Sequence, residues 1–244
     1  MPERIFIDKT VFFPEQGILA VGDLHVGYDY MLVQSGVLVP ERQIKETLED
    51  FARVFEKIKS LGYELKKIVF LGDIKHSFGY EFAERNELRE IIAALTKYVP
   101  EENIIFVKGN HDTMDYTLER KMKPYHIEPD AGIAFIHGHQ TFPEIFDKGI
   151  KTVVLGHLHP SVILEETPGV KREIYKCFLE GESHDKNLII LPSFLGMSEG
   201  TPVNTYIEDY SEDFSIVPKK DIMKFRIHVV GDDEVLDFGE VREL

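Results

Sequence analysis

The sequence predicts an α/β fold in which two stacked sheets are flanked by helices. In the part before residue 160, short apolar runs alternate with segments of helical spacing, which is typical of parallel strands joined by helices. After residue 160 the apolar runs are short and are separated by turn-like residues, which indicates a β-rich second part. No linker, low-complexity tract or internal repeat interrupts the chain. We therefore expect a single domain over residues 1–244, with a motif-bearing α/β part, 1–160, and a β-rich part, 161–244.

Two helices are expected in the first part, because apolar residues recur there at a spacing that places them on one helix face. The first covers residues 44–61 and ends at Gly62, and the second covers residues 82–98 and ends before Pro100. Short apolar runs around these helices predict buried strands. In chain order these runs are residues 17–21, 68–71, 104–107, 133–136, 153–155, 162–164, 188–191, 225–230 and 235–238.

The composition is that of a globular chain, with 43% hydrophobic and 29% charged residues among 244. The formal net charge of −15 argues against a protein that grips long nucleic acids through their phosphates, and favours a small or locally held substrate. The scattered lysines, Lys121 and Lys123 among them, are expected to be solvated surface. The chain has 27 Glu and 19 Lys but only 4 Gln and 5 Asn, a bias typical of a heat-adapted (thermophile) organism.

Neither a membrane span nor a disulfide is expected. No apolar run approaches the roughly 18 residues that cross a bilayer, and the first residues lack the pattern of a signal peptide, so we expect a cytoplasmic protein without a membrane partner. Cys177 is the only cysteine, which excludes an intramolecular disulfide and any zinc site built from several cysteines. It is expected in the core, and any metal must be bound by other residue types.

Five of the predicted strands end in a cluster of polar residues beside glycine. Loops at the carboxyl ends of strands in an open α/β sheet converge on one crevice, so we expect these clusters to meet in space. The glycines allow the backbone to turn sharply and to approach the site closely. The clusters are residues 22–25, 72–73, 109–112, 137–139 and 156–159.

These loops offer carboxylate, amide and imidazole groups, a set typical of a transition-metal site. Seven ligands are too many for one tetrahedral ion, but they suit two divalent ions about 3.5–4 Å apart that share a carboxylate. Mixed oxygen and nitrogen ligation favours Mn²⁺, with Fe and Zn²⁺ as alternatives. The predicted metal ligands are Asp23, His25, Asp73, Asn110, His137, His157 and His159.

The five clusters, in this order, resemble the signature of the calcineurin-like metallophosphoesterase superfamily: D-x-H, G-D, G-N-H-[DE], H with a nearby G-H, and G-H-x-H. The resemblance covers roughly residues 17–160. It implies a four-layer sandwich of two mixed β-sheets flanked by helices, and an enzyme that hydrolyses phosphoric esters by attack of a metal-bridging hydroxide. It places one ion between Asp23, His25, Asp73 and His159, and the other between Asp73, Asn110, His137 and His157.

The resemblance also assigns roles beyond metal binding. In similar enzymes the histidine that follows the ligand asparagine binds no metal, so His111 would protonate the leaving-group oxygen or stabilise the transition state, and Asp112 would orient its imidazole. His76 stands where many members carry Asn or Asp. His76 and His139 are candidates for contact with the substrate or for support of the ligand loops.

His76, residues 192–194 and the glycine-rich stretch up to Asn204 resemble the archaeal and bacterial branch related to double-strand-break repair nucleases and ligase-associated phosphoesterases. This implies a phosphodiesterase acting on nucleotides or nucleic-acid ends, with a DNA-repair partner. Related nucleases dimerise through helices beside the core, which implies a homodimer, although no helix here carries an unmistakable exposed apolar stripe. A phosphomonoesterase, a nucleotide pyrophosphatase and a non-catalytic scaffold of the same fold stay open as alternatives.

Overall fold

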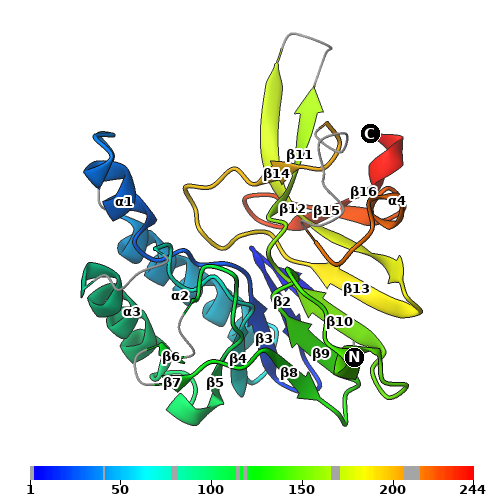
Figure 1. The fold of residues 1–244 in the computed structure, drawn as a ribbon, viewed down its shortest axis with the longest axis horizontal. Coiled ribbons are helices and arrows are strands. Elements are labelled where there is room, and N and C mark those ends of the chain that lie inside the picture. The colour runs from blue at the N-terminus through cyan, green and yellow to red at the C-terminus, as the bar shows by residue number, and fades with distance from the viewer. Residues whose placement is uncertain are drawn as a thin grey trace.

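Two β-sheets pack face to face in the computed structural model of the chain (Figure 1). The structure describes residues 3–40, 42–77, 82–113, 116–117, 120–165, 171–205 and 215–244. Both sheets mix parallel and antiparallel strands, so the predicted α/β class with two mixed sheets is confirmed. Among the described residues, no helix combines the length and the apolar character that a membrane crossing requires.

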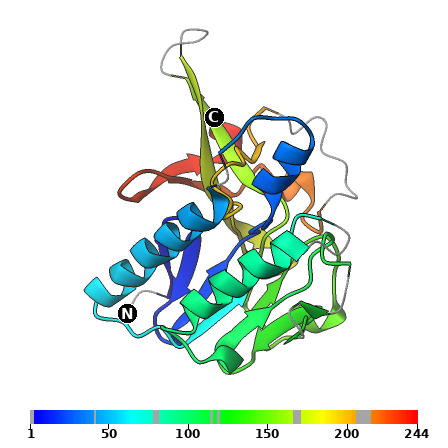
Figure 2. The same ribbon diagram turned by 90° about the vertical axis from the view of Figure 1, so that its left-hand side faces the viewer.

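The first sheet is covered on its outer face by two long helices, α2 (Gln43–Ser60) and α3 (Phe82–Leu95), which lie side by side in Figure 2. Apolar residues at helical spacing, such as Phe51 and Ile58 of α2, form the buried face toward the sheet. The antiparallel strands precede the parallel ones, which the helices connect. In sheet order the strands are β1 (Ile5–Ile7), β2 (Thr10–Phe13), β3 (Ile18–Val21), β4 (Lys67–Phe70) and β5 (Ile104–Phe106).

The second sheet has a parallel centre of β9, β10 and β13, with antiparallel neighbours on both sides. It begins at β8, so the chain changes sheets well before the change of sequence texture near residue 160. Along the sheet lie β14 (Thr201–Pro202), β11 (Pro160–Glu165), β12 (Arg172–Ser183), β13 (Lys186–Ile190), β10 (Thr152–Leu155), β9 (Ile133–Ile136) and β8 (Tyr125–Glu128), while β15 (Arg226–Val230) pairs with β12 and with β16 (Val235–Glu240).

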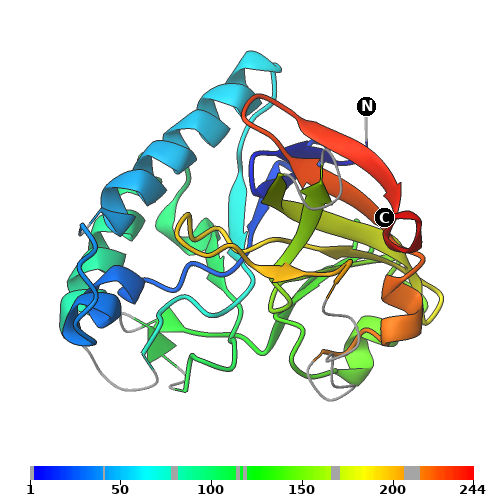
Figure 3. The ribbon, with the colours of Figure 1, turned by 90° about the horizontal axis from the view of Figure 1, so that it is seen from above.

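The outer face of the second sheet is covered by short helical segments rather than by long helices. Figure 3 shows the long helices on one side of the molecule and α4, β15 and β16 on the other. Ile145, Ile222 and Val241 from these short segments pack on the sheet. The segments are η2 (Pro143–Phe146), α4 (Lys219–Ile222) and η4 (Val241–Glu243); the remaining elements are α1 (Tyr28–Gln34), η1 (Glu101–Asn103) and the small sheet of β6 (Tyr116–Thr117) and β7 (Arg120–Lys121).

The predicted elements are present, with boundaries shifted by a few residues. The helix expected over residues 82–98 ends at Leu95, because the following residues form hydrogen-bonded turns before Pro100. The sequence reading missed β1, β2, β8 and β12. Cys177 of β12 is buried in the core, as predicted.

The space between the sheets is filled by apolar side chains from both of them, and Phe178 lies at its centre. Phe178 is fully buried, and its ring lies 4.4 Å from that of Phe6. We expect Phe178→Ala to lower the free energy of unfolding by about 3–5 kcal/mol, because truncation of a buried phenylalanine leaves a cavity. Urea denaturation measures this loss, and Phe238→Ala, on a partly exposed strand face, serves as the control. Equal losses in both variants would contradict this description of the core.

Candidate metal centre

The five predicted polar clusters meet at one edge of the two packed sheets. Asp23, Asp73 and Asn110 follow β3, β4 and β5 of the first sheet. His137 and His157 follow β9 and β10 of the second sheet. Hydrogen bonds join the loops. His25 N donates to Asp73 O at 2.9 Å in the first sheet, Gly156 N donates to His137 O at 2.9 Å in the second, and His157 N donates to Asp23 Oδ2 at 3.1 Å between the sheets. The strand ends of both sheets therefore build a single site.

The predicted ligand atoms form two of the three groups of potential metal-binding side chains among the described residues, and the third group is His25, His76 and His111. Asp23, His25 and His159 each offer one atom within 4.8 Å of the other two, and Asp23 Oδ1 lies 3.2 Å from His159 Nε2. Asp73, His137 and His157 form a second group of the same kind. Each group consists of three residues from one of the two ligand sets that the family resemblance implies.

Asp73 lies between the two groups. Its Oδ2 atom is 3.8 Å from His25 Nε2 in the first group and 3.5 Å from His137 Nε2 in the second. Its other oxygen, Oδ1, accepts a hydrogen bond of 2.9 Å from the backbone N–H of His111. One carboxylate oxygen thus faces both groups while the other fixes the orientation of the side chain, as a carboxylate shared by two ions requires.

The surroundings of His137 Nε2 fit a bound cation. His137 Nδ1 lies 2.9 Å from the carbonyl oxygen of Leu71, which can only accept, so Nδ1 carries the hydrogen. The lone pair is then on Nε2, which faces Asn110 Oδ1 at 2.8 Å and Asp73 Oδ2 at 3.5 Å. Asn110 Oδ1, Asp73 Oδ2 and this lone pair repel one another unless a positive ion lies among them, and His157 Nδ1, 3.0 Å from the same Nε2, is a further potential ligand atom. In the other group, His25 Nδ1 is buried without a hydrogen-bond partner among the described residues.

Burial sets the protonation of the site. It lowers the pKa of His25 and of His137 to about 3, so both rings are neutral at pH 7, the form that binds metal. Burial, and then the charge of Asp23, raises the pKa of Asp73. Burial acts on Asp23 in the same direction, but the neighbouring imidazoles, first of all that of His159, outweigh it and hold its pKa below the ordinary value. A divalent cation would relieve the repulsion between the two carboxylates.

The backbone at the site adopts strained conformations. His25, Asp73, His157 and His159 all have φ between 45° and 68°, in the left-handed region that favours glycine. Such strain is typical of functional sites, where surrounding contacts hold the backbone in place. Gly109 makes room for the Asp73 carboxylate, since a Cβ atom there would lie 2.1 Å from Asp73 Oδ1.

His111 points Nε2 toward the two groups of ligand atoms. The group that orients its ring is not Asp112, as expected, but a backbone carbonyl. Its Nδ1 lies 2.8 Å from the carbonyl oxygen of His76, and its Nε2 lies 4.0 Å from Asp73 Oδ2. The expectation that Asp112 orients this imidazole is corrected, because the Asp112 carboxylate is directed at the backbone: it accepts from Gly109 N at 3.0 Å and from Ile74 N at 3.3 Å. Asp112 is buried and ties the Asn110 loop to the loop of Asp73.

His76 and His139, predicted to contact substrate or to support the loops, both border the site. The half-buried His76 ring lies 5.4 Å from that of His25 and 5.6 Å from that of His111. The half-buried His139 ring lies 5.2 Å from that of His137, and burial lowers its pKa. Both rings are therefore placed on the rim of the two ligand groups.

One contributor to the site was missed from the sequence. The side chain of Gln43, at the start of α2, donates from Nε2 to the carbonyl oxygens of Leu24 at 3.1 Å and His25 at 2.8 Å, and accepts from Tyr28 N at 2.9 Å. It thereby holds the strained turn that carries His25. Because Gln43 acts on backbone groups, no ligand-like spacing in the sequence marks it.

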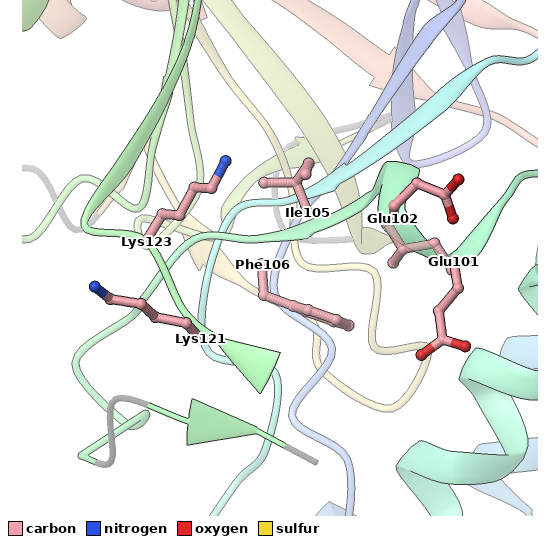
Figure 4. A pocket seen from close by; sticks show the side chains of 7 residues that line it. Glu101, Glu102, Ile105, Phe106, Lys121 and Lys123 are labelled. Atoms are coloured by element: carbon pink, nitrogen blue, oxygen red, sulfur yellow. The ribbon is translucent and has the colours of Figure 1, made fainter. Parts of the chain in front are cut away.

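Lys121 and Lys123 line a different cavity, of about 560 Å³, beside β5. Figure 4 shows the two lysines on one side of it and Glu101 and Glu102 on the other. Charges of both signs face this cavity, so it presents no continuous positive surface for a polyanion. This agrees with the expectation of solvated lysines.

Comparison with known proteins supplies a family. Residues 17–161, more than half of the chain, match the calcineurin-like phosphoesterase family. Among solved structures, Pseudomonas putida nuclease MPE has a TM-score of 0.58 and 21% sequence identity, covering 94% of this chain and 92% of that chain. A Vps29 double mutant from Entamoeba histolytica has a TM-score of 0.33 and 16% identity, covering 91% and 99%.

At these identities the nuclease shows a shared fold alone, and the TM-score of the Vps29 structure is too low to carry an argument. No curated protein matches the sequence. The family match contains all five polar clusters, and the structure brings those clusters together around two groups of metal-binding side chains. The chain therefore belongs to the calcineurin-like phosphoesterase family, whose members are metal-dependent phosphoester hydrolases.

Proposed function

We propose that this protein is a two-metal phosphodiesterase that acts on nucleotides or nucleic-acid ends, with Mn²⁺ as its metal. The observation that carries the proposal is the position of Asp73 Oδ2, which lies between two groups of metal-binding atoms. Asp23, His25, Asp73 and His159 would hold one ion, and Asp73, Asn110, His137 and His157 the other. Such a pair of ions polarises phosphoryl oxygens and activates water near neutral pH.

The accessible side of the site supports a role for His111 in the reaction. Asn110 is exposed, whereas Asp23, Asp73 and His137 are buried, so a substrate reaches the centre from the Asn110 side. His111 lies on that side with Nδ1 held by the His76 carbonyl. The His76 carbonyl can only accept, so Nδ1 carries a hydrogen, and a ring protonated on both nitrogens would direct its Nε2–H at the leaving-group oxygen or at a phosphoryl oxygen.

The fold and the charge of the molecule support a phosphodiester of a nucleotide or strand end as the substrate. The nuclease MPE shares the fold along nearly the whole chain, and nucleases cleave phosphodiesters. The net charge of −15 and the mixed charges of the cavity beside β5 favour a short or locally held substrate over a long duplex. Nucleotides and strand ends meet both conditions.

Metal-dependent hydrolysis of two chromogenic esters tests the proposal. Purified protein with Mn²⁺ is expected to cleave bis-p-nitrophenyl phosphate faster than p-nitrophenyl phosphate. Removal of the metal with EDTA should lower the rate by roughly a thousandfold, since metal ions supply several kcal/mol of transition-state stabilisation. Excess Mn²⁺ should restore the activity.

The outcomes of this assay separate the alternatives. Unchanged hydrolysis in EDTA would contradict a metal-dependent reaction. A preference for the monoester would indicate a phosphomonoesterase instead. Two bound metals without hydrolysis of either ester would favour a scaffold.

A further inference from the structure

The backbone carbonyl of the predicted ligand Asp23 is held by three donors from one distant segment. It accepts hydrogen bonds from Phe194 N at 2.9 Å, Leu195 N at 3.3 Å and Ser193 Oγ at 3.0 Å. Asp23 and Ser193 are both buried. A single carbonyl with three donors is firmly placed, so the conformation of residues 193–195 fixes the backbone that carries the Asp23 carboxylate.

The same segment is held from its other side by Lys176 of β12. Lys176 Nζ donates to the carbonyl oxygen of Ser193 at 2.7 Å and also to that of Leu195. One ammonium group therefore binds both ends of the turn whose donors hold Asp23. The chain of contacts runs from Lys176 through residues 193–195 to Asp23.

Packing around Gly22 leaves little freedom in this chain of contacts. A Cβ atom at Gly22 would lie 2.4 Å from the carbonyl oxygen of Pro192, so the two backbones are in direct contact. A shift of residues 192–195 would therefore move the neighbouring Asp23, whose Oδ1 lies 3.2 Å from His159 Nε2. Movement of the segment would change the spacing between these two ligand atoms.

We propose that Lys176 is a positioning residue of the metal centre, which fixes Asp23 through the carbonyl oxygens of Ser193 and Leu195. This role rests on the proposed function, in which Asp23 is a metal ligand. Burial, and then the charge of Lys9, lowers the pKa of the Lys176 amine to about 7. The amine has at least two hydrogens in either protonation state, so it keeps both hydrogen bonds when it loses its charge.

The chain offers a matched control in Lys186 of β13. Lys186 is buried, whereas Lys176 is half-buried, and its Nζ likewise donates to two backbone carbonyls, those of Asp147 at 2.8 Å and Ile150 at 2.7 Å. Those carbonyls belong to the connection that enters β10, whereas the predicted ligand His157 follows the other end of that strand. Loss of Lys186 therefore removes the same kind of contact without a connection to Asp23.

The test compares Lys176→Met with Lys186→Met, because methionine keeps most of the side-chain volume and removes the donors. Isothermal titration calorimetry of the metal-depleted full chain measures Mn²⁺ binding, and thermal unfolding in EDTA measures stability. Lys176→Met is expected to raise the Kd of Mn²⁺ about tenfold, since loss of groups that orient metal ligands costs 10–100-fold in affinity. Lys186→Met should unfold at a lower temperature but bind Mn²⁺ like the wild type.

The rate of ester hydrolysis, measured at increasing Mn²⁺ concentrations, gives a second test of this proposal. Lys176→Met should regain most of its activity at saturating Mn²⁺, because the ligands and His111 are all present. Wild-type Mn²⁺ affinity in Lys176→Met, or the same loss of affinity in Lys186→Met, would overturn the proposal.

Ser193→Ala serves where Lys176→Met fails to fold. It removes one of the three donors to Asp23 and is expected to raise the Kd of Mn²⁺ about fivefold, the effect of one hydrogen bond. Unchanged affinity in this variant would then overturn the proposal.

If the wild type neither binds Mn²⁺ nor cleaves either ester, the proposed function itself is wrong. If the wild type does both and the variants bind Mn²⁺ equally well, only the role of Lys176 is wrong.

Discussion

Replacing Asp73 with asparagine is expected to reduce Mn²⁺-dependent hydrolysis by about a thousandfold or more. Asp73 Oδ2 faces His25 of one ligand group and His137 of the other, so this change removes a negative charge from both prospective metal positions. The neutral amide is also a much weaker ligand for a divalent ion than a carboxylate. Initial rates with bis-p-nitrophenyl phosphate measure the loss of activity, and mass spectrometry of dialysed protein measures the bound metal.

The control for this prediction is Asp130→Asn, in the exposed turn between β8 and β9. This variant should leave the rate of hydrolysis and the amount of bound metal unchanged. Asparagine at position 73 keeps an oxygen that can accept the 2.9 Å hydrogen bond from His111 N, and its neutral amide resembles the neutral acid that the raised pKa of Asp73 favours in the metal-free protein. The metal-free variant should therefore unfold in EDTA at a temperature no lower than the wild type. Full activity in Asp73→Asn would show that this carboxylate is not the shared ligand.

The ligand loops are the part of the site that the sequence predicts best. Asp23, Asp73 and His157 each stand beside glycine at the end of a short apolar run, and strand ends in an α/β sheet converge. Both the residue type and its position along the chain are local features, so they can be read without coordinates. The structure then adds what is not local: the two groups of ligand atoms and the place of Asp73 between them.

The groups that position these ligands could not be predicted, because they act on the backbone of distant segments. Gln43 is the first residue of α2 and lies 18 positions from the His25 carbonyl that it binds. Lys176 is one of many lysines in the chain, and nothing near it in sequence refers to Ser193. Asp112 illustrates the converse: the family resemblance implied a contact with the His111 imidazole, whereas the carboxylate is turned toward Gly109 and Ile74.

The failure of the sequence to predict β12 has a related explanation. β12 runs from Arg172 to Ser183 with charged and polar residues at most positions, and its buried residues are limited to 177–180 in the middle and Ser183 at the end. Its first residues pair with β11 in a hairpin that extends from the body of the molecule (Figure 1). Apolar periodicity marks strands by their contact with a core, so a strand that is half outside the core escapes it.

Replacing His111 with alanine is expected to lower kcat by about 10²–10⁴-fold while the bound metal stays at the wild-type level. The structure orients the His111 ring through the His76 carbonyl and places Nε2 toward the centre, 4.0 Å from Asp73 Oδ2. The variant removes a proton donor but none of the predicted ligands. Metal content by mass spectrometry and kcat by initial rates test the two halves of the prediction, with the exposed His184→Ala as the control.

The leaving group distinguishes the two roles open to His111. Nitrophenolate leaves readily without a proton, whereas the sugar oxygen of a dinucleotide needs one. If His111 is a general acid, His111→Ala should slow cleavage of the dinucleotide far more than cleavage of bis-p-nitrophenyl phosphate. If it only stabilises charge on the phosphoryl oxygens, both rates should fall by the same factor. Loss of metal in parallel with activity would instead make His111 part of the metal site and leave the leaving group without a proton donor from this loop.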